Sequence, residues 1–291
     1  MIRGNDLEEQ VHEPEHIHQV LEAIAGTLPH YLNDFARHQP KATLRTAVEH
    51  WHNEQEAYRD YLDLEVLDEF EYDAAAFKSH TASACPIIRR CLNSPSEVMV
   101  EYQRSFRLTS GRTLLDAVRS ISDFARSYAS HFDDRLHEAA AEPADLGLEP
   151  LNEGELGVGG VIGYGVQSCM LHGVYPREFA LRTQDAVWAL YFLSERQDFG
   201  LADGSEFLMV YPDRGFCEQN YFYPAQLFGF YALKVFLVLR EFCGAKYGKF
   251  DDRYRYIYLN AFLGHVAEMH RTDINALRQT SEYVENQPWW R

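Results

Sequence analysis

Positive charge is scarce in this sequence. Its 27 lysines and arginines stand against 44 aspartates and glutamates, which gives a formal net charge of -17 at pH 7. A surface of that sign repels phosphate backbones, so broad binding of nucleic acids is not expected without a local basic patch. The same field attracts proteins whose surface is basic.

Paired cysteines and long apolar runs are lacking as well. The five cysteines are odd in number and include no CxxC pair, which favours reduced thiols in a cytoplasmic protein. The most apolar run, 225–239, is interrupted by Gly229 and Lys234 and is too short to span a bilayer. The segment 1–10 has no apolar core of the kind that a signal peptide needs. We therefore expect a cytoplasmic protein without a membrane segment.

Apolar residues at helical spacing dominate what is present. In the segment 110–141 they recur at every third or fourth position: Leu114, Val118, Ile121, Ala125, Tyr128, Phe132, Leu136 and Ala139. This spacing predicts one long helix with a single apolar face. Similar patterns predict helices at 15–35 and 43–70, with shorter ones between 83 and 110. Together they predict an N-terminal helical bundle over residues 1–143.

The second half is predicted to be helical and rich in aromatic residues. Residues 144–160 mix proline, glycine, asparagine and acids, which is typical of a linker. Helices are expected at 161–172, 183–194, 224–242, 252–270 and 273–283. The turn sequence Pro212-Asp213-Arg214-Gly215 predicts a small β-hairpin at 206–223. The expected fold is therefore all-α, with helical domains at 1–143 and 161–291 and one hairpin.

Acidic residues gather on the helix predicted at 43–70. Nine acids stand between residues 54 and 73, against the single base Arg59. Four acids share one helical stripe: Glu49, Glu56, Asp60 and Asp63. The pattern fits a solvated face, and it also fits a docking surface for a basic partner protein.

Two patterns that suggest a metal site fail on geometry. The segment 12–16 reads HEPEH and matches HExxH, but Pro14 cannot sit inside the continuous helix that a zinc protease needs. His265, Glu268 and His270 also look like a ligand set, yet a step of five along a helix turns the side chain by about 140°. We therefore expect no metal site and no cofactor.

Cys169 and His172 lie three residues apart, so they could touch on one helix face. A thiolate nucleophile also needs an orienting group and an oxyanion pocket. The sequence locates neither, and both residues sit in an apolar helix, which favours core packing.

A second catalytic candidate lies at 126–131, where Arg126 and His131 form an Arg-x4-His pattern. The pattern resembles the motif of HEPN ribonucleases, which are all-α bundles that cleave RNA without a metal. The resemblance implies a dimer whose two motifs share one cleft. It also implies that Arg126 stabilises the transition state and that His131 acts as acid or base. Such a protein would be a toxin or a defence effector.

The glycine-rich segment gives a third candidate. Gly163-Tyr164-Gly165 resembles the hairpin of helix-hairpin-helix DNA-binding domains, and 175–179 (YPREF) resembles a segment of related base-excision glycosylases. This implies a nucleic-acid-processing module. We rank this hypothesis last of the three functions, because the segment 136–176 contains no lysine or arginine to hold phosphate.

No catalytic pattern in the sequence is complete. The first hypothesis is therefore a non-enzymatic protein that binds or regulates another macromolecule, most simply a protein with a basic surface. A metal-independent ribonuclease is the alternative. Whether the chain forms a homodimer stays open.

Overall fold

Proline residues open three helices of the N-terminal half. α2 (Pro14–Phe35), α3 (Pro40–Tyr61) and α6 (Pro86–Asn93) each have proline in the first turn, where its missing N–H has no helical partner to lose. The structure, a computed structural model, describes residues 12–96, 99–152, 154–196, 207–211, 216–220, 225–248 and 250–276. The last helix predicted, 273–283, lies mostly outside these residues.

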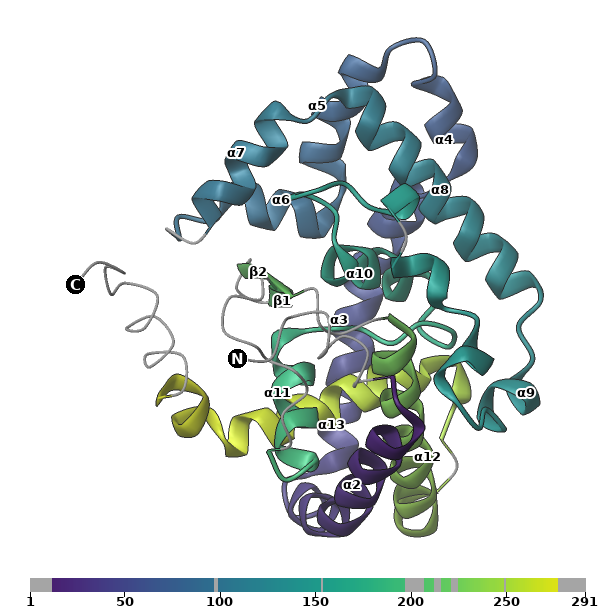
Figure 1. The fold of residues 1–291 in the computed structure, drawn as a ribbon, viewed down its shortest axis with the longest axis vertical. Coiled ribbons are helices and arrows are strands. Elements are labelled where there is room, and N and C mark those ends of the chain that lie inside the picture. The colour runs from purple at the N-terminus through teal and green to yellow at the C-terminus, as the bar shows by residue number, and fades with distance from the viewer. Residues whose placement is uncertain are drawn as a thin grey trace.

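The fold is mainly helical, as predicted (Figure 1). The other α-helices of the described residues are α4 (Leu64–Glu69), α5 (Ala74–Ala84), α7 (Val100–Leu108), α8 (Gly111–Ser130), α9 (Asp134–Glu138), α10 (Tyr164–Val174), α11 (Gln184–Leu193), α12 (Ala225–Tyr247) and α13 (Arg255–Met269). Short 3-10 helices lie between them: η2 (Pro143–Leu146), η3 (Glu149–Asn152), η4 (Gly154–Leu156) and η5 (Asp252–Tyr254). No helix among the described residues is both long and apolar enough to cross a membrane.

Two of the long helices predicted from the sequence are each broken by an aspartate. The helix expected at 43–70 is two helices, because Asp63 caps α4 by accepting from the amide of Glu65 at 2.8 Å. The helix expected at 110–141 ends at Ser130, and Asp133 caps α9 by accepting from the amide of Arg135 at 2.7 Å. Leu136 is consequently 74% exposed instead of facing the core. The prediction of one continuous helix was wrong in both places.

One large hydrophobic core connects both halves of the chain. It includes Leu28 of α2, Val118 of α8 and Phe228 of α12. α3 runs through the middle of Figure 1 and packs against α10 and α13, while α12 packs against α2 and η2. The predicted division into two domains stays a prediction.

The segment predicted as a linker packs closely on α12. Leu146, Leu148 and Leu151 are at most 4% exposed. Gly229 makes this approach possible, because a Cβ there would lie 2.7 Å from Cδ1 of Leu148. Substitution of Gly229 would therefore require Leu148 to move.

The described strands are β1 (Phe207–Tyr211) and β2 (Phe216–Asn220), which pair antiparallel with Phe207 opposite Asn220. Residues 212–215, which would form the turn between them, lie outside the described residues. The hairpin at 206–223 as a whole stays a prediction.

Candidate functional site

Exposed carboxylates line one side of α3. The opposite side of this helix is held in the core by Leu44, Tyr58 and Tyr61, which are at most 7% exposed. Glu49, Glu56 and Asp60 all face solvent. Glu49 lies 3.7 Å from Nε of Arg45, whereas no described residue makes an ion pair with Glu56 or Asp60. We call Glu49, Glu56 and Asp60 the acidic face of α3.

Asp63 was expected to continue this stripe. It lies beyond the end of α3 and is exposed, but one of its carboxylate oxygens is occupied in capping α4. Asp63 therefore adds charge at the end of the acidic face without standing on the same helix.

Arg126 and His131 lie near the C-terminal end of α8, and both are exposed. His131 is the residue that follows the helix. Its Nδ1 lies 2.8 Å from the carbonyl oxygen of Ser127 and 3.0 Å from Oγ of Ser130. A hydrogen bond to that carbonyl requires the proton on Nδ1, which leaves Nε2 as the basic nitrogen of the neutral ring. The helix places the two residues five positions apart on the exposed end of α8.

Cys169 and His172 are both buried in α10, at 4% and 5% exposure. Burial raises the pKa of the Cys169 thiol and lowers the pKa of His172 to about 4. His172 Nδ1 lies 3.0 Å from the carbonyl oxygen of Phe179. These environments favour a neutral thiol and a neutral imidazole, which suits core packing better than nucleophilic catalysis.

The glycine-rich segment before α10 forms a tight turn. Val158 pairs with Ile162 in an isolated antiparallel bridge, and Gly160 between them has φ of 70°. A Cβ on Gly160 would lie 2.8 Å from Oγ of Ser105. Backbone conformation and close approach both account for this glycine. The helix-hairpin-helix interpretation stays a prediction.

An ion-pair network centred on one buried arginine joins α9 to the C-terminal helices. Arg255, the first residue of α13, is 0% exposed, and its Nη2 lies 2.8 Å from Oδ1 of Asp134 and 3.1 Å from Oε1 of Glu138. Arg177 also donates to Asp134, and Arg240 donates two bonds of 2.6 and 2.7 Å to Glu138. The bond from Arg177 holds the pKa of Asp134 below its usual value, and the bonds from Arg240 do the same for Glu138.

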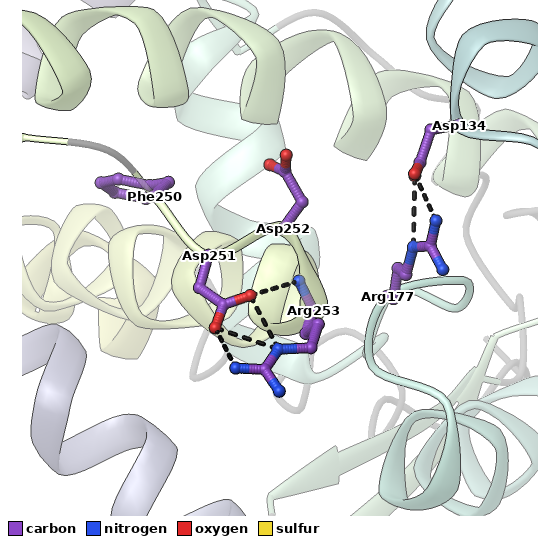
Figure 2. Close-up of a pocket in the computed structure, with 6 residues that line it drawn as sticks. All are labelled: Asp134, Arg177, Phe250, Asp251, Asp252 and Arg253. Carbon is purple, nitrogen blue, oxygen red and sulfur yellow. Dashed lines mark hydrogen bonds and ion pairs between the residues drawn. The ribbon is translucent and has the colours of Figure 1, made fainter.

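A cavity of about 580 Å³ lies beside this network. It is lined by Asp134, Arg177, Phe250, Asp251, Asp252 and Arg253. Figure 2 shows that both arginines of the wall are bound to aspartates: Arg177 to Asp134, and Arg253 to Asp251. Three carboxylates therefore face two guanidinium groups, so these six residues offer no unpaired cation to an anionic ligand.

A third cluster joins α2 to α13. Asp34 lies in the last turn of α2, His38 lies just beyond that helix, and His265 lies on α13. Nε2 of His265 is 3.0 Å from Oδ2 of Asp34, and Nδ1 of His38 is 3.3 Å from the same oxygen. His270 contacts different residues, with its Nε2 2.8 Å from the hydroxyl of Tyr31. No spacing in the sequence indicates that His265 lies beside Asp34 and His38.

Comparisons with known proteins give no family assignment. No protein-family model matches the chain, and neither curated proteins nor solved structures include a significant match.

Proposed function

We propose that this protein is a cytoplasmic, non-enzymatic regulator that binds a partner protein with a basic surface through the acidic face of α3. The observation that carries the proposal is the exposure of Glu56 and Asp60, with which no described residue forms an ion pair. Asp63 and Glu49 extend the negative charge at either end. The whole chain carries a net charge of -17, which adds long-range attraction to the same partner.

Electrostatic docking of this kind has a defined signature. Exposed charges speed association and select the partner, and salt screens them over a Debye length of about 8 Å at physiological ionic strength. Binding should therefore weaken as salt is added, and charge reversal on α3 should weaken it more than reversal elsewhere.

Charge reversal at Glu56→Lys and Asp60→Lys is expected to abolish partner capture at low salt. The experiment uses the tagged full chain and a lysate of the cells that make it, with captured proteins identified by mass spectrometry. A partner that supports the proposal is basic and is released when salt is raised. The matched control is Asp123→Lys with Glu241→Lys, two exposed acids on α8 and α12. It changes the net charge by the same amount and should retain the partner.

Equal loss of the partner in both double variants would assign the attraction to net charge instead of the acidic face. Capture that is indifferent to salt and to both variants would remove the proposal.

A metal-independent ribonuclease is the second proposal, supported by the state of His131. Its Nδ1 is held by Ser127, so Nε2 is the nitrogen left to take a proton from a ribose hydroxyl. Arg126 is exposed and can reach a phosphate brought by RNA. The motif would act in a homodimer that brings two copies together.

The ribonuclease proposal predicts RNA cleavage in the presence of EDTA. His131→Ala is expected to reduce the rate at least 100-fold, within the ~10²–10⁴-fold that a general acid or base contributes. His52→Ala is the control, because His52 is likewise exposed and likewise has Nδ1 2.8 Å from a helix carbonyl, that of Val48. Cleavage that survives His131→Ala would come from another site or a contaminant.

A further inference from the structure

The cluster of Asp34, His38 and His265 brings three side chains of metal-binding type to one point. One ligand atom from each lies within 4.8 Å of the other two. Oδ2 of Asp34 lies 3.0 Å from Nε2 of His265 and 3.3 Å from Nδ1 of His38. The carboxylate oxygen therefore sits between two imidazole nitrogens.

The local fold holds two of these side chains in place. Phe35, next to Asp34, is 1% exposed and packs against the rings of Phe262 and His265, with centroids 5.5 and 5.2 Å apart. This contact fixes α2 against α13 and orients His265 toward Asp34. The Asp34 and His265 side chains are only 22% and 17% exposed, whereas His38 is 60% exposed and covers the cluster from the solvent side.

The spacing of the three atoms fits a small divalent cation. Zinc bound by nitrogen and oxygen at about 2.0–2.2 Å in a tetrahedron places its ligand atoms roughly 3.3 Å apart. Two of the three separations are already near that value. Two imidazoles and one carboxylate also form a donor set that zinc accepts.

We propose that Asp34, His38 and His265 bind one Zn²⁺ ion, with a fourth position open to water. His38 and Asp34 are four residues apart at the end of α2, while His265 is 231 positions from Asp34 along the chain. The ion therefore joins α2 to α13. It stabilises the folded chain because the unfolded chain does not bring the three ligands together.

The three residues can instead form hydrogen bonds with one another in the absence of an ion. Nδ1 of His38 lies 2.9 Å from the backbone carbonyl oxygen of Asp34, and His38 must give up this hydrogen bond to bind the ion through Nδ1. A measurement of binding separates these two arrangements.

The test is a calorimetric titration of the EDTA-treated full chain with ZnCl₂. We expect one equivalent of tight binding. His38→Ala and His265→Gln should each weaken it at least tenfold, because each removes one of three protein ligands. His38 is exposed, so its variant is not expected to disturb the core.

The matched control is His18→Gln, because His18 and Glu22 form an exposed imidazole–carboxylate pair of 3.2 Å on the same helix. Among the described residues that pair has no third ligand of metal-binding type, so the control should bind like the original chain.

A thermal melt gives an independent readout. At a free zinc concentration of 100 times the dissociation constant of the original chain, the melting temperature of that chain should rise by about 5 °C, and that of His38→Ala by at most about half as much. The proposal is overturned if the chain takes up no zinc. It is also overturned if His38→Ala and His265→Gln bind zinc as tightly as the original chain.

Discussion

Replacing Arg255 by alanine is expected to lower the free energy of unfolding by roughly 2–5 kcal/mol, the usual cost of truncating a large buried side chain to alanine. Arg255 is 0% exposed and donates to both Asp134 and Glu138. Its guanidinium also lies over the rings of Phe132 and Phe236, at 5.8 and 5.5 Å from their centroids. Alanine removes all of these contacts and leaves a cavity between α9, α12 and α13.

The remaining arginines limit this loss but do not prevent it. After the substitution Asp134 still accepts from Arg177, and Glu138 still accepts from Arg240, so neither carboxylate is left without a partner. Both would nevertheless lose the cation that is shielded most completely from water, where attraction is strongest. The network therefore holds α9 against the start of α13 chiefly through Arg255.

Urea unfolding at neutral pH, followed by circular dichroism, measures the effect. Arg253→Ala is the matched control, because Arg253 is two residues away, its side chain is 75% exposed, and its ion pair is with Asp251 outside the network. We expect an unchanged urea midpoint for that control. Equal midpoints for Arg255→Ala and Arg253→Ala would show that the contacts of Arg255 contribute nothing to stability.

The starts of helices could be predicted from the sequence. The helices predicted to start at residues 15 and 183 are α2, which Pro14 opens, and α11, which Thr183 caps by accepting from the amide of Ala186. Such signals are local: a proline or a capping side chain acts on amides within three residues. They need no knowledge of the rest of the fold.

The breaks within helices could not be predicted from periodicity. The apolar stripe that passes Ser130 continues in phase through Phe132, yet the chain turns at His131 and restarts at Asp134. The sequence did contain a signal for the start of a second helix, because Asp133 is of a residue type that caps helices. Apolar residues at helical spacing do not show whether one helix or two successive helices carry them.

The clusters that join distant segments could not be predicted from the sequence. In the sequence His265 stands beside Glu268 and His270, whereas in the structure its contacts include Asp34 and His38. Arg255 gave a weak signal, as a cation beside an apolar helix, but its partners lie more than 100 residues away. Only the packing of α13 against α2 and α9 brings these groups together.

Two buried histidines are expected to make the fold strongly sensitive to mild acid. Burial lowers the pKa of His137 from the usual 6.5 to about 3, with the positive charge of Arg255 acting in the same direction. Burial alone lowers the pKa of His172 to about 4, against a small opposing effect of its bond to Phe179.

The direction of the effect follows from linkage. In the unfolded chain both imidazoles take up protons near pH 6.5, while in the folded chain they stay neutral until pH 4 or below. The unfolded state therefore binds more protons between these values, so stability is complete above pH 6.5 and is lost as the pH falls. Each histidine costs about 1.4 kcal/mol per pH unit in this window, which gives about 4 kcal/mol for the pair between pH 7.5 and 5.

Variants that cannot take up the proton isolate this contribution. His172→Asn keeps a donor for the carbonyl of Phe179, and His137→Gln keeps a polar atom for the hydroxyl of Tyr256, which lies 2.7 Å from Nε2. Between pH 7.5 and 5 the double variant should lose about 4 kcal/mol less of its free energy of unfolding than the original chain does, measured by urea unfolding at both pH values.

The raised pKa of Glu178 acts in the opposite direction, but it is common to both chains and cancels in the comparison. His52→Asn, in which the exchanged side chain is exposed, should lose as much as the original chain. If the double variant lost as much as the original chain, protonation of these two imidazoles would not be the cause of acid sensitivity.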